Sequence, residues 1–542
     1  MASWASADIR SLWGFFALWI LVSSVLYKLR TVGRRPKGLP PGPPTLPIIG
    51  NIHQIPNTHP HRQYQKWANQ YGPIYSLMLG TRVMIVLSSD RVIKDLLDKR
   101  SAIYSDRPEY HIGQEVLSGN NRFVHIGYND TWRIVRKLGQ RLFNKTVSEA
   151  YIPYQDLESK AMLLGFLTSP TEFKNHIRRY SGSLAWQMTF GVRNVTIEDP
   201  RLQKAFGILE EHFALAASMT SAFLDSFPVL RRLPDALLPV RRQARELYER
   251  EHKMWLEECA RAKEDLAAEN PVPCFCADLV RLQDQIGVSD DVAADFGGNL
   301  FQANGETTSS ILVGFVQAMV IFQNVARKAQ DELDRVCGTR IPSLDDMPDL
   351  PYIRGCVKET LRWMPGALVG VPHAATRDDE YLGYIIPKGA VIMYNTWAVH
   401  NDLQRHPEPR VFDPTRWAND KQTAAEAAAN PDVTKRDHFA FGVGRRLCPG
   451  IHIAERSLSL AIARLLWAFE FHRVKDTQGK DIVPDMEDLT DGFFCLPRPF
   501  KAHFVPREGK AELVRRDWDE ATKLLDKNLQ WREVPKGLTK VI

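Results

Sequence analysis

Cys448 lies in a glycine-rich stretch, Phe441 to Gly450, that can present a thiolate to a metal. Glycine lets the backbone approach a large flat group without side-chain clashes. Pro449 suits the first position of a helix, which the apolar periodicity of residues 451–469 predicts. Cys448 would then lie at a helix N-terminus, where an anionic sulfur is favoured, and Arg446 adds a cation that can meet a carboxylate. A lone cysteine is more often a small buried hydrophobe, so this residue alone leaves both interpretations open.

An acid next to an alcohol, Glu306–Thr307, falls in the middle of a long predicted helix. Ser289 is a suitable N-cap, and the helix is expected to continue to about Gln323. At about 1.5 Å per residue it would cross a whole domain. Burying an acid and a hydroxyl in mid-helix is unfavourable unless they are partnered or functional. The pair therefore predicts proton transfer, with a polar pair on a wet helix face as the alternative.

Two further pairs are spaced to share a helix face. Glu359 and Arg362 are three residues apart and can form a bidentate ion pair, although such a pair contributes little on a surface. Trp132 and Arg136 are four apart on a helix predicted over residues 131–143. Arg136 taken alone is equally consistent with a surface cation.

These stretches together resemble the cytochrome P450 family. The family's cysteine-ligand loop reads Phe, two residues, Gly, one residue, Arg, one residue, Cys, one residue, Gly. Residues Phe441, Gly444, Arg446, Cys448 and Gly450 match every position of it. The resemblance implies that Cys448 is the axial ligand of a haem iron, whose thiolate favours O–O cleavage.

The resemblance covers about residues 36–505. It implies a mainly α fold, a helical domain with a small β-rich region, joined to an N-terminal transmembrane anchor helix. It also implies roles for several side chains. The expected catalytic pair is Glu306 and Thr307; the expected haem contacts are Trp132, Arg136, His373, Phe441, Arg446 and Cys448; and the expected structural brace is Glu359, Arg362 and Arg416, the last from Phe412–Trp417.

Asn304 departs from the family pattern, which usually has glycine at this position, and Gly305 follows it. The departure leaves the shape of the oxygen pocket open. Six residues are candidates for a substrate pocket, although most such side chains are ordinary core: Phe213, Phe301, Asn304, Val369, Phe493 and Phe494.

The N-terminal region predicts a membrane anchor. Residues 11–27 carry no charge and are at the short limit for a spanning helix, and Lys28, Arg30, Arg34 and Arg35 follow. We expect an uncleaved, single-pass anchor in the endoplasmic reticulum with a cytosolic catalytic domain; a cleaved secretory signal is the alternative. The expected organisation is an anchor and basic flank (1–35), a proline-rich hinge and entry loop (36–59), a haem-thiolate monooxygenase domain (60–505) and a charged C-terminal extension at the surface (506–542).

Composition excludes some functions. The net charge of +6 is mild, and no basic run interleaved with aromatic residues suggests nucleic acid. Seven irregularly spaced cysteines in a long chain argue against a disulfide framework and favour a reducing compartment. Four residues, Arg133, Lys137, Arg141 and Arg445, could form a basic patch for an acidic electron donor, with a plain solvated face as the alternative.

The expected activity is that of a haem-thiolate monooxygenase that takes electrons from NADPH through a separate cytochrome reductase. Residues 327–336 and 371–373 resemble fungal members of the family that act in secondary metabolism. We therefore expect an apolar, aromatic small molecule as substrate, which is either hydroxylated or oxidatively coupled through its phenol groups. One alternative is a haem-thiolate isomerase or dehydratase that needs no dioxygen. The other is a non-catalytic haem-binding protein.

Overall fold

A long helix, α13 (Asp290–Ile321), runs through the body of the protein, and the other helices pack around it. The computed structural model describes residues 4–266, 272–492 and 494–535. The Ser289 hydroxyl accepts the Val292 amide and caps the helix. Helix α8 (Phe173–Phe190) packs along α13, and α11 (Pro239–Asp265) and α18 (Ile451–Ala468) pack beside it. The predicted helix from Ser289 to about Gln323 is confirmed.

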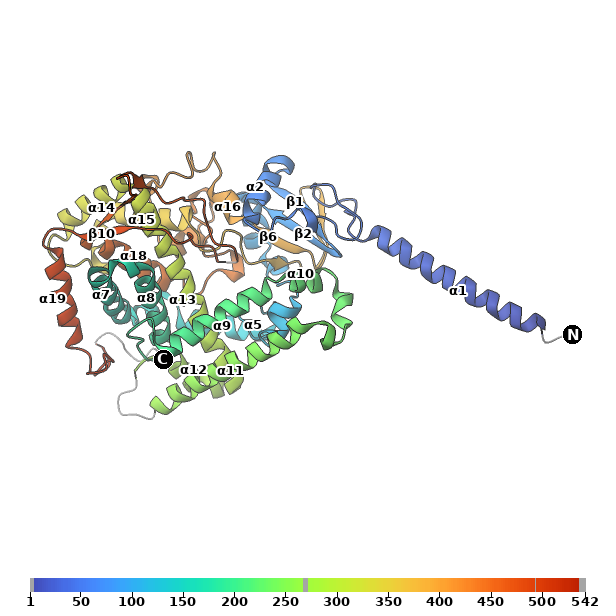
Figure 1. Cartoon of the computed structure of the whole chain (residues 1–542), viewed down its shortest axis with the longest axis horizontal. Helices are drawn as coiled ribbons and strands as arrows, with labels where there is room; N and C mark the ends of the chain where they lie inside the picture. The colour runs from blue at the N-terminus through green and yellow to red at the C-terminus, as the bar shows by residue number, and fades with distance from the viewer. Residues whose placement is uncertain (1–3, 267–271, 493, 536–542) are drawn as a thin grey trace.

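The remaining helices form the bulk of the body (Figure 1). They are α2 (Pro60–Tyr71), α3 (Asp90–Ile93), α4 (Ser101–Tyr104), α5 (Asp130–Leu142), α6 (Lys145–Glu149), α7 (Ile152–Thr168), α9 (Pro200–Ala216), α10 (Met219–Ser226), α12 (Phe275–Ile286), α14 (Gln323–Val336), α15 (Pro351–Trp363), α16 (Thr396–His400), α17 (Ala424–Ala429) and α19 (Lys510–Thr522).

A small sheet lies on the side of the body from which the N-terminal helix leaves (Figure 1). Its strands are β1 (Ile74–Leu79), β2 (Arg82–Leu87), β6 (Val391–Tyr394) and β3 (His373–Ala374), in that order. β1 and β2 form an antiparallel hairpin, and β6 adds parallel to β2. Three two-stranded pairs complete the strands: β4 (Asp379–Tyr381) with β5 (Tyr384–Ile386), β7 (Phe469–His472) with β10 (His503–Pro506), and β8 (Val474–Lys475) with β9 (Asp481–Ile482). The mainly α prediction with a small β-rich region is confirmed.

Helix α1 (Trp4–Thr31) projects away from the body as a separate arm (Figure 1). Three of its aromatic side chains face solvent: Trp13, Trp19 and Tyr27 are each at least 65% exposed. Among the described residues, no single helix is both long and apolar enough to span a bilayer. Helices α13 and α14 taken together are long and apolar enough, but they are bent by 103° where they meet. The expected membrane span remains a prediction.

The basic flank after α1 is bonded into the folded body. Arg35 Nε donates to Ser76 Oγ at 2.9 Å, and its Nη2 donates to the carbonyls of Pro43 and Ser76 at 2.8 and 3.0 Å. The amide of Ile48 donates to the carbonyl of Val32 at 2.8 Å. The expected extended hinge therefore packs against β1 along part of its length.

The C-terminal extension was expected at the surface, and that expectation is wrong for residues 510–531. α19 packs against α7, and Leu157, Ala521 and Leu525 form a small buried cluster. Gln530 and the backbone of Arg193 exchange hydrogen bonds at 2.9 and 3.0 Å. The charged composition of the tail hid its apolar contacts, because the charges lie on the outer face of α19.

Candidate active site

Cys448 lies between a short turn (Gly444–Arg446) and the first residue of α18. Its amide donates to the carbonyl of Phe441 at 2.8 Å and so closes the loop on itself. Gly442 and Gly444 have φ angles of 79° and 57°, a left-handed conformation that glycine adopts without strain. A Cβ atom at Gly444 would also collide with the carbonyl oxygen of Leu97. The loop pattern therefore reflects backbone geometry as well as chemistry.

Burial raises the pKa of the Cys448 thiol, while the Gly450 amide and the charge of Arg136 act in the opposite direction. A coordinated metal ion deprotonates a cysteine thiol outright. The loop thus holds a sulfur that needs a metal to become a stable thiolate.

Three hydrogen-bond donors beside the loop are buried and unused. Arg446 lies over the ring of Trp132, 4.4 Å from its centroid, and Arg136 Nη1 donates to the carbonyl of Leu447 at 2.6 Å. Yet Trp132 Nε1, Arg136 Nε and Arg446 Nη1 have no hydrogen-bond partner in the part of the chain that the structure describes. Buried donors are rarely left unpaired, so these three suit an anion, as the carboxylates of a haem would be.

Two more basic side chains flank this cluster. Arg107 donates from Nη1 to the carbonyls of Val371 and Pro372, at 2.9 and 2.7 Å, just before β3. Burial, with Arg107 nearby, lowers the pKa of Arg446 to about 8. His373 is fully buried and pairs through Nδ1 with the carbonyl of Tyr104 at 2.6 Å, which leaves Nε2 for another partner. Arg107 escaped the sequence analysis, because nothing around it marks a site.

Glu306 lies on α13 and is held by a cation from another helix. Arg178 of α8 donates to one Glu306 oxygen from Nη2 at 2.8 Å, and its Nη2 also reaches Glu210 of α9 at 2.6 Å. The Thr307 hydroxyl donates to the carbonyl of Ala303 at 2.7 Å. The acid and the alcohol are adjacent in sequence but have separate partners, so the structure holds each of them independently.

Asn304 does not break α13, which is continuous through this segment. Its Oδ1 accepts the hydroxyl of Thr308 at 3.3 Å, and its amide contacts the sulfur of Met188 on α8. The hydroxyl of Ser181 donates to the carbonyl of Gly305 at 2.6 Å. Polar contacts with α8 therefore accompany the departure from glycine.

The pocket candidates separate into different environments. Phe301, one of these candidates, is fully buried among Trp186, Phe206 and Trp255. Its direction follows from its turn of α13, which faces α8 and α11. Phe213 and Phe494 meet edge to face at 5.4 Å. Val369 is half-buried against the sheet, and Phe493 lies outside the described residues.

The expected brace is present in full. Arg362 Nε and Nη2 bond both oxygens of Glu359 at 2.8 and 2.7 Å, and both side chains are fully buried. Arg416 Nε and Trp417 Nε1 donate to the same carboxylate at 3.4 and 3.0 Å. The negative charge of Glu359 is therefore fully hydrogen-bonded, as a buried charge must be.

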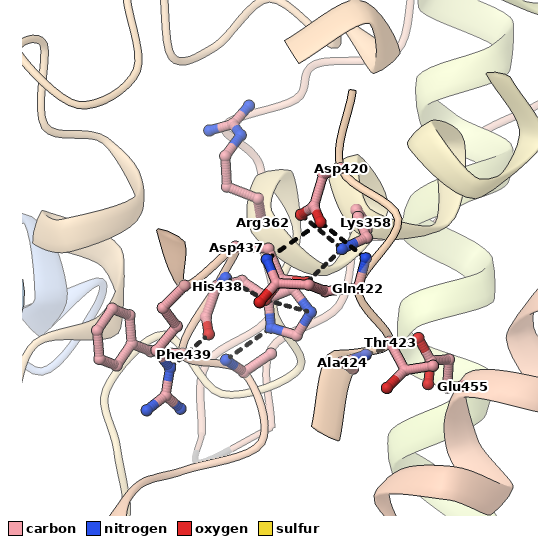
Figure 2. Close-up of polar contacts among 12 residues, drawn as sticks. Lys358, Arg362, Asp420, Gln422, Thr423, Ala424, Asp437, His438, Phe439 and Glu455 are labelled. Atoms are coloured by element: carbon pink, nitrogen blue, oxygen red, sulfur yellow. Dashed lines mark hydrogen bonds and ion pairs between the residues drawn. The ribbon is translucent and has the colours of Figure 1, made fainter. Parts of the chain in front are cut away.

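A second buried ionic cluster lies near the loop (Figure 2). Lys358 Nζ bonds Asp420 at 2.7 Å and Asp437 at 3.1 Å. Glu455 of α18 accepts the amide of Ala424 at 2.8 Å, at the start of α17. Helix α17 ends at Ala429, and Ala424 is buried. The cluster links α15, α17 and α18 behind the cysteine loop, and the sequence analysis missed it because its members are far apart in the chain.

Comparisons with known proteins identify the family of the chain. The family model described as Cytochrome P450 matches residues 40–504. The chain is 54% identical to cytochrome P450 monooxygenase virE of Hypocrea virens, over 97% of this chain and 96% of that protein. It is 53% identical to cytochrome P450 monooxygenase fogE of Aspergillus ruber, over 96% and 97%.

The fold has a solved counterpart. A zebra fish cytochrome P450 structure with abiraterone aligns with a TM-score of 0.66 at 21% identity, over 83% of this chain and all of that chain. This likeness concerns the fold, whereas the match to the family model and the identity to the fungal relatives extend over nearly the whole sequence. The chain therefore belongs to the cytochrome P450 family and is a haem-thiolate monooxygenase.

Proposed function

We propose that Cys448 is the axial haem ligand and that Trp132, Arg136, Arg446 and His373 bind the haem carboxylates. The observation that carries this proposal is a set of three donors beside the cysteine loop that have no partner among the described residues: Trp132 Nε1, Arg136 Nε and Arg446 Nη1. Phe441 accepts the Cys448 amide and keeps the loop closed. Bound haem supplies the redox chemistry that cleaves dioxygen.

The chain's own contribution to the reaction is proton supply. Glu306 pairs with Arg178, whose other partner, Glu210, is solvent-exposed. Because an arginine side chain keeps its proton, we assign Arg178 and Glu210 to orienting Glu306, whose carboxylate carries protons inward. The Thr307 hydroxyl, whose proton is held on the Ala303 carbonyl, would deliver them at the reaction site.

The proposed substrate is an apolar, aromatic secondary metabolite. The reaction is either its hydroxylation or the oxidative coupling of its phenol groups. The naming of the fungal relatives as monooxygenases supports an oxidation. The edge-to-face pair Phe213–Phe494 supports an apolar lining. An intact acid–alcohol pair disfavours the isomerase or dehydratase alternative, which has no need of proton supply to dioxygen.

The proposed electron donor is an NADPH-cytochrome reductase that docks on a basic surface. Arg133, Lys137, Arg141 and Arg445 are exposed, and the ring of Tyr128 lies between Arg133 and Arg445. Such a patch steers an acidic partner by charge. We propose that α1 holds the protein at the endoplasmic reticulum membrane with the catalytic domain in the cytosol, supported by its exposed aromatic rings and the basic residues that follow.

The test is reconstitution of the full chain with haem, reductase and NADPH. Product formation should require all three and dioxygen, whereas an isomerase would act without NADPH. The Cys448→Ala variant should lose the thiolate-type carbon monoxide difference spectrum, and a retained spectrum would overturn the ligand assignment. Comparing the metabolites of a gene-deletion strain with those of its parent identifies the substrate, which should accumulate in the deletion.

A further inference from the structure

His400, the last residue of α16, pairs reciprocally with Arg362 of the brace. Arg362 Nη1 donates to the His400 carbonyl at 2.9 Å. His400 Nδ1 lies 2.9 Å from the Arg362 carbonyl. The two residues are 38 positions apart and both are buried. The imidazole is therefore held against the buried end of α15.

The other nitrogen of the same ring is also used. The amide of Phe439 donates to His400 Nε2 at 2.8 Å. Because a backbone amide can only donate, Nε2 must be unprotonated, and the ring proton must lie on Nδ1 and be donated to Arg362. Burial lowers the pKa of His400 well below its usual range, so the ring is neutral. One neutral imidazole thus connects the brace to the segment that precedes the cysteine loop.

Phe439 leads directly into that loop. Two residues later, the carbonyl of Phe441 accepts the amide of Cys448 at 2.8 Å. The guanidinium of Arg436 lies 4.2 Å from the centroid of the Phe439 ring and donates to the carbonyl of Gly442. The Phe439 amide held by His400 is therefore connected to the Cys448 amide through the backbone as far as Phe441 and one hydrogen bond.

We propose that His400 is a positioning residue that holds the Cys448 loop in register with the Glu359–Arg362 brace and thereby keeps the sulfur ligated as a thiolate. The inference rests on the proposed role of Cys448. A histidine suits this position because it offers one donor and one acceptor on opposite sides of a rigid ring. Loss of the bridge would leave the Phe439 amide buried and unpaired, which favours movement of the loop.

His406 provides a matched control. It is also buried, and burial lowers its pKa to about 3. Its ring packs against Trp417 at a tilt of 60°, with 5.9 Å between centroids, but its Nε2 has no hydrogen-bond partner within the described residues. A substitution at His406 therefore removes a buried imidazole near the brace without cutting a bridge to the loop.

The experiment compares His400→Asn, His400→Gln and His406→Asn in the full-length haem protein. Asn places its amide near the position of Nδ1 and can keep the donor toward Arg362, whereas the longer Gln places its amide oxygen near the position of Nε2 and can accept from Phe439. We expect His400→Asn to convert from the thiolate-type to the thiol-type carbon monoxide spectrum about tenfold faster than the unsubstituted protein, which corresponds to about 1.4 kcal/mol. The Phe439 amide should exchange with deuterium faster by a similar factor, while His406→Asn stays within about twofold.

His400→Gln should recover most of both losses, a rescue that a purely space-filling role would not produce. Equal behaviour of His400→Asn and His406→Asn in both measurements would overturn the proposal. If His400→Asn yields no folded haem protein, His400→Gln decides: normal spectra with normal Phe439 exchange support the bridge, and normal spectra with fast exchange overturn it. Failure of the Cys448 assignment is separate, because it would appear as a thiolate spectrum in Cys448→Ala.

Discussion

Arg178 donates two hydrogen bonds to a single carboxylate oxygen of Glu306, from Nη2 at 2.8 Å and from Nε at 3.1 Å. The same guanidinium lies 4.1 Å from the centroid of the Phe206 ring. A stacked, bidentate arginine holds a carboxylate in one orientation. The Glu306 side chain is therefore held in place by Arg178 of α8, which also bonds Glu210 of α9.

Replacing Arg178 with Gln should lower the yield of product per NADPH consumed. Glu306 would lose its orientation, and we expect a loss of about tenfold, which is less than the roughly hundredfold or more that an acid–base group itself contributes. Arg250→Gln is the control, because Arg250 forms an exposed ion pair with Glu211 of α9. Coupling unchanged by Arg178→Gln would contradict the proposed route.

Replacing Thr307 with Ala should uncouple NADPH use from product more strongly, by about tenfold to a hundredfold, because the proton-delivering hydroxyl is removed. Thr308→Ala is the matched control, since that hydroxyl bonds Asn304 within the helix. Both variants lose a hydroxyl from adjacent positions of α13. If the two variants lost coupling equally, the Thr307 hydroxyl would have no special role in proton delivery.

Replacing Glu359 with Gln should destabilise the protein by about 3–5 kcal/mol, because two buried arginine contacts lose their charge partner. The thermal unfolding midpoint of the haem protein measures the loss. Glu487→Gln, which alters half-exposed ion pairs of Arg62 and Arg410, should cost less. Comparable losses of stability in the two variants would mean that the buried brace contributes no more than a half-exposed ion pair.

Replacing Trp531 with Ala should lower stability by about 2–3 kcal/mol. Its Nε1 donates to Gln187 at 2.9 Å, and its ring packs against Tyr154. Lys527→Ala, an exposed change in the same segment, should leave the unfolding midpoint unchanged. An unchanged unfolding midpoint in Trp531→Ala would show that the C-terminal extension does not stabilise the body.

Glu455 should make stability depend on pH. Burial raises the pKa of this carboxyl to about 7, although Lys358 acts in the opposite direction. The folded state then binds the proton more tightly than the unfolded state, so stability should fall as pH rises from about 4.5 to about 7.

Relative to Glu455→Gln, the unsubstituted protein should lose about 1–2 kcal/mol of unfolding free energy across that window. Denaturant unfolding at pH 5 and pH 7.5, with the exposed Glu257→Gln as control, measures it. The opposite slope would mean that Lys358 outweighs burial at this carboxyl.

The features that the sequence predicted correctly are those set by short spacing. The cap at Ser289 and the pair Glu359–Arg362 each depend on a few neighbouring residues, and both are present. Local propensity and helix periodicity suffice for such elements.

The features that were missed or wrong depend on which helices meet. Arg178 lies 128 residues before Glu306, and His400 lies 39 before Phe439, so no local pattern links them. The ring contacts of Phe301 with Trp186 of α8 and Trp255 of α11 likewise join residues that are far apart in the sequence.

The bonding of Arg35 has a practical consequence for the orientation of the enzyme. Since Val32 and Arg35 are tied to the body within four residues of the end of α1, the arm leaves at an angle set by the fold rather than by a slack tether. A shortened chain that starts after Arg35 would remove a guanidinium that joins Gly42, Pro43 and Ser76, and so would loosen β1 along with the arm. Removing α1 while keeping residues 32–35 separates these two effects.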